Sequence, residues 1–279
     1  MIPKEVFHYT SAKVALEKIL LEKQLKLGQL QFTNDPKESK LENIVHLPMI
    51  IYNGMPARKF MRQMTMEQSM IQVASKIKLR EWKVLCVSKN HPDLDSNKAT
   101  TKDNPFLSGS FRPAMWAHYA STHNLHTGVC LKFNGNNLDR RIRETFKDKK
   151  SFTVFSGHIE YGDLKLFELS PIDMTDIHKL NNKGVEIRLR NHFIEKYEEI
   201  FLRKSRDWEN EHEFRWLVHR RRDSPEYISI FGILEEVLVG DEFPQKWWPK
   251  LFKRCREIQV SLKRVRWLDG IPFGLPIYY

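Results

Sequence analysis

The segment EHEFRWLVHR, residues 211–220, carries the clearest regular pattern in the chain. Its charged residues alternate with large apolar ones. The charged set is Glu211, Glu213 and Arg215, and the apolar set is Phe214, Trp216 and Val218. Because side chains of a β-strand point alternately to its two faces, the pattern predicts a strand with one apolar and one charged face. At a rise of about 3.3 Å per residue, Glu211 and Glu213 lie about 7 Å apart on that charged face.

Two carboxylates on one face are suited to a reaction in which a sugar becomes positively charged. Departure of a glycosidic leaving group produces an oxocarbenium-like centre, which a nearby carboxylate stabilises. A solvated strand face, or a Glu–Arg ion pair of small value with Arg215, explains the same spacing. The spacing alone therefore leaves a catalytic and a structural interpretation open.

A second candidate group lies near the start of the chain, where VFHYT (residues 6–10) predicts a short strand. His8 and Thr10 share a face of this strand, so both can hydrogen-bond one polar ligand while Tyr9 packs behind them. The two ring nitrogens of a histidine suit ribose hydroxyls. The alternative is a histidine at the edge of the core that is satisfied by the backbone.

The rest of the chain predicts strands and helices in mixed order. Ser11 is a predicted N-cap for a helix that follows the first strand. Further strands are expected at 83–89, 128–134 and 235–240, and helices at 185–204 and 245–255. No internal repeat or convincing linker is present, so residues 1–279 are expected to form a single α+β domain, with a helical, methionine-rich insertion around 55–82.

Composition restricts the class of protein further. No apolar run approaches the ~20 residues that span a bilayer, and the first ten residues contain no apolar signal core. The three cysteines, Cys86, Cys130 and Cys255, are far apart and form no C-x-x-C pair, which argues against a zinc finger or a disulfide framework. We expect a reducing, cytoplasmic setting, no bound metal and no membrane partner.

The net charge of +11 favours polyanionic partners. Many basic proteins are simply basic, and no single run dominates here. The candidate contacts to nucleic acid are Lys204, Arg215, Arg220, Arg221 and Arg222.

Two shorter motifs complete the candidates. Asn34-Asp35-Pro36 suits a ligand-binding turn, although a capped turn before a helix explains it equally. Trp116 and Tyr119 share a helix face, which suits stacking on a planar ring or ordinary core packing. Neither a Walker loop nor G-x-G-x-x-G occurs, which argues against a P-loop enzyme and a Rossmann dehydrogenase.

Taken in order, these motifs resemble the bacterial domain-of-unknown-function family 2971. The resemblance covers nearly the whole chain. The matching positions are His8 to Thr10, Asn34 to Pro36, Cys86 to Ser88, Met115 to Tyr119, Gly128 to Cys130, Lys204, Trp208 and Glu211 to Arg215.

The layout is also similar to that of the ADP-ribosyltransferase superfamily, which implies a central split β-sheet flanked by helices. By this resemblance His8, with Tyr9 and Thr10, binds the ribose of NAD, and Ser88 supports the nicotinamide side. Trp116 or Tyr119 stacks on nicotinamide. Asn34 and Asp35, in a turn that has no counterpart in the best-known members, are expected as further NAD contacts. Glu213 binds the ribose hydroxyl and stabilises the cation, and Glu211 orients the acceptor.

The resemblance therefore implies an ADP-ribosyltransferase that uses NAD as its substrate, and the basic charge favours RNA or DNA as the acceptor. Such an enzyme would be toxic to its host, which predicts a toxin or phage-defence effector with a neutralising antitoxin. The alternatives are a non-catalytic basic nucleic-acid-binding module and a transferase that acts on protein. A metal-dependent nuclease is a more distant alternative, because the carboxylates and histidines are poorly assembled for two ions.

Overall fold

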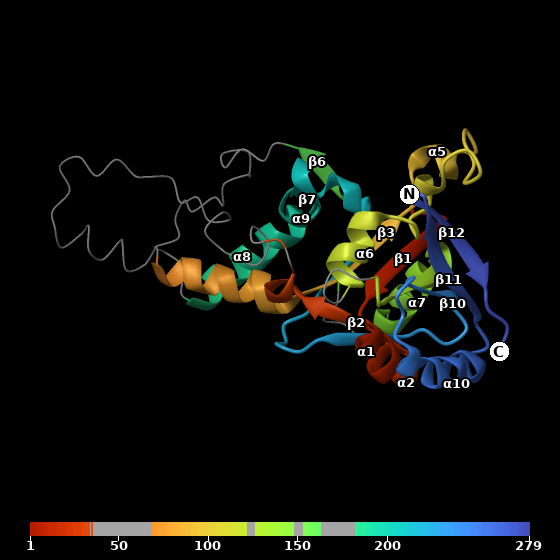
Figure 1. Cartoon of the computed structure of the whole chain (residues 1–279). Coiled ribbons are helices and arrows are strands. Elements are labelled where there is room, and N and C mark those ends of the chain that lie inside the picture. Colours follow the sequence, from red (N-terminus) through yellow and green to blue (C-terminus); the bar gives the residue numbers. More distant parts are fainter. Residues whose placement is uncertain (34, 36–67, 122–125, 148–152, 163–181) are drawn as a thin grey trace.

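A computed structural model of the chain describes residues 1–33, 35, 68–121, 126–147, 153–162 and 182–279. Strands and helices are mixed along these residues, which confirms the predicted α+β class (Figure 1). The strands are β1 Glu5–Thr10, β2 Gln24–Gln29, β3 Trp82–Lys89, β4 Val129–Asn134, β5 Thr153–His158, β6 Glu160–Gly162, β7 Arg203–Ser205, β8 Glu213–His219, β9 Glu226–Ser229, β10 Leu234–Val239, β11 Ser261–Leu268 and β12 Ile271–Pro276.

Several helices flank the strands. The α-helices are α1 Ala12–Val14, α2 Leu20–Glu22, α5 Pro92–Asp95, α6 Pro113–Tyr119, α7 Gly135–Phe146, α8 Asn182–Glu195, α9 Tyr197–Phe201 and α10 Trp248–Ile258. A π-helical turn, Ala15–Ile19, joins α1 to α2, and a second one, Ile77–Glu81, continues a helix over 68–76 into β3. Short 3₁₀ helices cover Leu30–Phe32, Pro105–Leu107, Arg206–Glu211 and Gln245–Trp247. No helix in the described ranges is both long and apolar enough to cross a bilayer.

Most of the described strands form one mixed sheet. Its main order is β12-β11-β10-β4-β1-β3-β2-β9, with β8 beside β3 and β5 beside β8. The neighbours pair antiparallel except for β10 and β11, which are parallel. The short strands β6 and β7 form a separate parallel pair.

The sheet divides along one side of β3. The end of β3 pairs with β1 through Ser88 and Lys89, and its beginning pairs with β2 through Lys83 and Val84. Between these two contacts β1 and β2 separate, whereas β8 accompanies β3 along its other side from Trp82 to Ser88. This division gives the sheet a natural opening next to the middle of β3.

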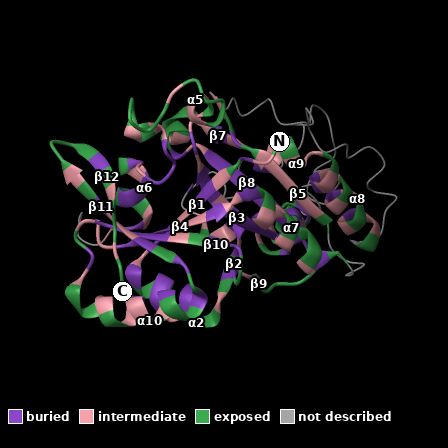
Figure 2. Cartoon of the chain, turned by 90° about the vertical axis from the view of Figure 1, so that its right-hand side faces the viewer, coloured by how far each residue is buried: buried purple, intermediate pink, exposed green. Residues whose placement is uncertain are grey.

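Apolar side chains cover both faces of the sheet. One face packs on helix 12–22, α7 and α10 through residues such as Leu16, Ile142 and Leu251. The opposite face packs on α8 and α9 through Phe193 and Phe201. A smaller cluster lies beneath α6. Buried residues therefore follow the strands on both sides, as Figure 2 shows.

The local predictions can be compared with these elements. Ser11 caps the first helix, and its Oγ accepts a hydrogen bond from the backbone N–H of Val14. The helix expected over 185–204 is divided into α8 and α9 and ends before β7. Met70 of the predicted insertion is helical and buried, and residues 55–67 lie outside the described residues.

Candidate functional site

A cavity of about 310 Å³ lies at the division of the sheet. It is lined by residues of β1, β2 and β3, by the segment that follows β2, and by α6. Lys204 of β7, Glu211 and the first residues of β8 complete the lining. The lining residues are Phe7, His8, Tyr9, Lys26, Gly28, Gln29, Phe32, Thr33, Val84, Leu85, Cys86, Val87, Met115, Tyr119, Lys204, Glu211, Glu213 and Arg215. The opening between β1 and β2 therefore gives access to polar groups that come from opposite ends of the chain.

The two glutamates do not lie on one straight strand, so that prediction was wrong. Glu211 ends a 3₁₀ helix, His212 adopts a left-handed conformation with φ of 45°, and β8 begins only at Glu213. Hydrogen bonds to β3 hold this bend. Ser88 Oγ donates to the Glu211 carbonyl at 2.8 Å, and the Lys89 N–H donates to the His212 carbonyl at 3.0 Å.

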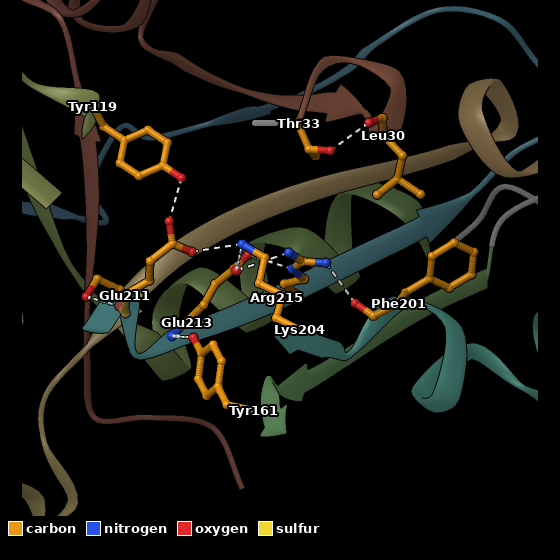
Figure 3. Close-up of polar contacts among 10 residues, drawn as sticks. Leu30, Thr33, Tyr119, Tyr161, Phe201, Lys204, Glu211, Glu213 and Arg215 are labelled. Atoms are coloured by element: carbon orange, nitrogen blue, oxygen red, sulfur yellow. Dashed lines mark hydrogen bonds and ion pairs between the residues drawn. The ribbon is translucent and has the colours of Figure 1, made fainter. Parts of the chain in front are cut away.

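The bend allows both carboxylates to contact one lysine. Lys204 Nζ lies 2.8 Å from a carboxylate oxygen of Glu211 and 2.8 Å from one of Glu213 (Figure 3). These oxygens are therefore closer together than the spacing of a straight strand would place them. Lys204 comes from β7, outside the main sheet, and is itself buried.

Glu213 is held on several sides. Arg215, two residues along the same face of β8, donates to its two oxygens from Nε at 2.5 Å and Nη2 at 3.0 Å. Its backbone N–H donates to Tyr161 Oη at 2.8 Å. Burial raises the pKa of Glu213, but the charges of Arg215 and Lys204 and hydrogen bonds from Arg215 and Cys86 outweigh it and lower the pKa to about 2. Glu213 is therefore ionised at neutral pH.

Glu211 has different partners. Tyr119 Oη donates to its Oε1 at 2.6 Å, and Lys204 donates to its Oε2 at 2.8 Å. Burial and the neighbouring Glu211 raise the pKa of Tyr119, so its hydroxyl stays protonated and remains a donor. Tyr119 thus connects α6 to the acidic pair across the cavity (Figure 3).

His8 approaches the same cavity from β1. Its Nδ1 lies 3.4 Å from the carbonyl oxygen of Cys86, at the part of β3 where the sheet divides. Burial lowers the pKa of His8 below its ordinary value, so the ring is neutral at pH 7. A neutral imidazole has one donor and one acceptor nitrogen, and this pair suits a sugar hydroxyl.

Part of the cavity lining lies in a segment that matches a known protein family. Residues 115–216 match a family described as protein of unknown function (DUF2971). This match confirms the predicted resemblance to that family over this stretch. No curated protein and no solved structure matches the chain.

The DUF2971 segment brings together Tyr119, Lys204, Glu211, Glu213 and Arg215, whereas His8 lies outside it. Within the described residues, no group of three or more histidine, cysteine, aspartate or glutamate side chains could hold a metal ion. The polar side chains that line the cavity are two carboxylates, three cations, two phenols, an imidazole, an amide, a hydroxyl and a thiol.

Among the described residues, four predicted NAD contacts do not line the cavity: Trp116, Ser88, Thr10 and Asp35. Trp116, within the DUF2971 segment, is fully buried, and its Nε1 donates to the Ser110 carbonyl at 2.9 Å. Ser88 is also fully buried and holds the bend before β8. Thr10 is buried at the end of β1. Tyr9 does line the cavity, and its hydroxyl donates to the Gly109 carbonyl at 2.6 Å.

Of the five predicted nucleic-acid contacts, three are buried or ion-paired and two are exposed. Arg215 is 1% exposed and paired with Glu213, so it is not a surface cation. Lys204 is buried between the two glutamates. Arg220 is ion-paired with Glu226. The remaining two, Arg221 and Arg222, are exposed after the end of β8.

Of the Asn34-Asp35-Pro36 motif, the structure describes only Asp35. Asn34 and Pro36 lie outside the described residues, and Asp35 is buried. The cavity also contains groups that the sequence motifs did not indicate, among them Lys26, Gly28 and Phe32. A glycine inside an extended run was the available signal, because strand glycines often mark a close approach of a ligand.

Proposed function

We propose that this chain is a cytoplasmic ADP-ribosyltransferase that takes ADP-ribose from NAD and transfers it to a nucleic-acid acceptor. One observation carries the proposal. A single cavity at the division of the sheet is lined both by His8 from the first strand and by the carboxylates of Glu211 and Glu213. We further propose that the activity is that of a toxin or defence effector and that a protein antitoxin restrains it.

The reaction needs one bond broken and one bond made. The bond between ribose C1′ and the nicotinamide nitrogen breaks, and its electron pair leaves with nicotinamide as a neutral molecule. A lone pair of the acceptor then forms the new bond to C1′, and the acceptor gives up a proton. The transition state carries positive charge on the ribose, which an ionised carboxylate at close range stabilises.

The chain offers a group for each of these tasks. Glu213, with its pKa of about 2, is a permanently ionised carboxylate beside the ribose position. Glu211 receives hydrogen bonds from Tyr119 and Lys204 and is placed to accept the acceptor's proton. His8 is neutral and suited to hold ribose hydroxyls, and Tyr119, on the cavity lining, is the group for the nicotinamide side.

The size of the cavity agrees with part of such a substrate. A volume of about 310 Å³ is at the lower end of ligand pockets, which span roughly 300–1,000 Å³. It suits the nicotinamide-ribose half of NAD, with the remainder of the dinucleotide outside the enclosed space. Lys26 and Gln29 lie on the lining and can hydrogen-bond polar groups there.

Glu211→Gln is the sharpest test, because it leaves the Glu213–Arg215 pair intact. Purified protein is incubated with NAD labelled in the adenylate moiety and with RNA, DNA and protein fractions. Wild type should transfer label to nucleic acid and release nicotinamide, and Glu211→Gln should reduce both by about 100-fold or more. The matched control is Glu209→Gln, an exposed glutamate of the same 3₁₀ helix, which should keep wild-type activity.

The result that would overturn the proposal is equally direct. Wild type that neither binds nor consumes NAD with any acceptor fraction is not a transferase of this kind. Label that appears on protein alone would retain the reaction but replace the acceptor. In cells, wild type should arrest growth, and the Glu211→Gln variant should not.

A second function has one specific observation in its favour. The charges of Lys204 and Arg215 balance those of Glu211 and Glu213, and Glu213 is tied to both cations. Such a cluster could serve folding alone in a non-catalytic nucleic-acid-binding module. In that case wild type binds nucleic acid with a steep salt dependence, NAD stays intact, and Glu211→Gln leaves nucleic-acid binding unchanged.

A further inference from the structure

The outer face of β2 and β9 continues from the cavity to the edge of the sheet. Lys26 and Gly28 alternate along β2 and both line the cavity. Leu25, Leu27 and Ile228 point to the opposite face, where they belong to the apolar core. Directly opposed residues of antiparallel strands share a face, so Tyr227, which pairs with Lys26, projects from the cavity side.

Aromatic rings are unusually exposed along this path. Phe32 lines the cavity yet is 70% exposed, and Tyr227 is 44% exposed. Phe231 follows β9 and is 55% exposed. We call these three residues the stacking strip.

Lysines accompany the stacking strip. Lys26 is exposed on β2 beside Tyr227, and Lys23 Nζ lies 5.5 Å from the centre of the Phe231 ring. The backbone around Phe231 is held in place, because Arg141 donates hydrogen bonds to the carbonyls of Ser229 at 3.1 Å and Phe231 at 3.3 Å. Phe231 therefore has a fixed backbone at the edge of the sheet, beside α7, which packs on the other face.

The acids near this face are already paired with cations. Asp223 accepts hydrogen bonds from Gln29 at 2.5 Å and from Arg80 at 3.0 Å, and Glu226 is ion-paired with Arg220. The same contact from Gln29 places the loop that carries Arg222 next to the cavity lining. The local charge that faces an approaching ligand is therefore positive.

We propose that this face binds a single-stranded nucleic acid, with bases stacked on the stacking strip and phosphates held by Lys23 and Lys26. Exposed rings alternating with cations are the arrangement by which proteins bind unpaired strands, because every base has a face for stacking and every linkage carries a negative charge. Bases inside a duplex are stacked on one another and cannot use such rings. The strand then passes Phe32 at the cavity and presents its reactive nucleotide to Glu211 and Glu213.

The inference deepens the proposed function, and its role in delivering an acceptor rests on that function. Binding itself does not. It can be measured without NAD, so failure of strand binding and failure of ADP-ribosyl transfer give separate results.

The test measures binding of fluorescein-labelled oligonucleotides of about 12 nucleotides to the full chain by fluorescence anisotropy. The probes are oligo(U), oligo(dT) and a duplex of the same length. Wild type should bind the single strands at least 10-fold more tightly than the duplex. The RNA and DNA arms show which sugar the face accepts.

Variants of the strip separate stacking from charge. Phe32→Ala and Tyr227→Ala should each weaken binding between about 5-fold and 100-fold. Lys26→Gln should weaken it and make the slope of log affinity against log salt less steep by about one. The matched controls are Phe273→Ala and Tyr278→Ala, exposed aromatics on and after β12, at the other end of the sheet order, which should bind like wild type.

Three outcomes would overturn the proposal. Wild type could fail to bind the single strands at low salt. The control variants could weaken binding as much as Phe32→Ala, which would indicate a general loss of fold or charge. Heparin could compete with equal effect in wild type and in the aromatic variants, which would show attraction by charge alone.

Discussion

Replacing Glu213 by glutamine should destabilise the fold before it reveals anything about catalysis. The carboxylate of Glu213 pairs through two oxygens with Arg215, which is 1% exposed. Glutamine keeps the size of the side chain but turns one acceptor into an N–H donor that faces the guanidinium. Arg215 cannot lose its proton, so it is left as a buried charge with a missing partner.

Two arguments give the size of the expected loss in the free energy of unfolding. Breaking a buried ion pair by removing one partner costs about 3–5 kcal/mol. The pKa of Glu213, lowered from 4.5 to about 2, corresponds to about 3 kcal/mol of stability at neutral pH. For a chain of this size such a loss lowers the Tm by roughly 6–20 °C. It is a large part of the 5–15 kcal/mol that typically stabilises a domain.

Thermal and urea unfolding monitored by circular dichroism measure this effect. The sign of the pH dependence gives a second readout. Because the folded-state pKa is lowered, the wild-type contribution is complete above about pH 4.5 and is lost as the pH falls towards 2. Glu213→Gln should lack this part of the acid dependence. Glu213→Gln combined with Arg215→Met should recover much of the stability, because no lone charge remains buried.

The reasoning is refuted if Glu213→Gln unfolds within about 2 °C of wild type. Glu211→Gln serves as the comparison, since it leaves the pair between Glu213 and Arg215 in place. A loss of activity in Glu211→Gln without a similar loss of stability then reports on chemistry.

Three further predictions follow from single positions. Gly28→Leu should weaken NAD binding at least 10-fold in calorimetry, while the Tm changes by less than about 2 °C. A Cβ at Gly28 meets no atom within 4 Å, and the new side chain enters the cavity. A lower Tm with normal NAD binding would contradict this prediction. Gly128→Ala should lower the free energy of unfolding in urea by about 1–3 kcal/mol, because the added Cβ would lie 2.5 Å from Cα of Ala120 at the end of α6. An unchanged unfolding midpoint would show that the neighbouring backbone moves away without cost. His212→Asn should flatten the rise of stability with pH between about 4 and 6.5. Burial, then the charge of Arg112 and other cations, lowers the pKa of His212 to about 4, so the unfolded chain binds more protons than the folded chain in that pH range. Unfolding midpoints at pH 5 and pH 7 test this, and an unchanged slope would assign the pH dependence to other groups.

The sequence pattern predicted a strand or helix correctly where the tertiary packing agrees with the local preference. The apolar alternation around Phe214 and Trp216 indicated a strand, and both residues pack in the main core of the sheet. The first strand and its Ser11-capped helix were evident for the same reason. The resemblance placed His8 and Glu213 in one site, and the structure brings them to one cavity because β3 lies between β1 and β8.

The environment of Arg215 could not be inferred from its neighbours in sequence. Alternation indicates that Arg215 and Glu213 share a face, but not that this face is covered. Phe201 and Leu202 cover it from a segment that precedes β8, and Arg215 Nη1 donates to the Phe201 carbonyl at 2.8 Å. The residue expected to touch nucleic acid is therefore an internal cation.

The roles of Trp116 and Tyr119 illustrate the same limit. Their spacing places both on one side of a short helix, yet only Tyr119 reaches the cavity. Trp116 instead packs edge-on against Tyr9, with ring centres 5.3 Å apart. Which of two aromatic residues faces a ligand depends on how the helix is rotated against the sheet, and that rotation is fixed by distant contacts.

The left-handed backbone at His212 gives the acidic pair a property that strand pairing alone would not. Glu213 is fixed by its pairing with Ser88 in the sheet, whereas Glu211 lies before the left-handed His212 and is held by the hydrogen bond from Ser88 Oγ to its carbonyl. The position of Glu211 therefore depends on the left-handed backbone at residue 212 and on the hydrogen bonds that join this bend to β3. One carboxylate is placed by strand pairing, and the other by the bend that precedes the strand.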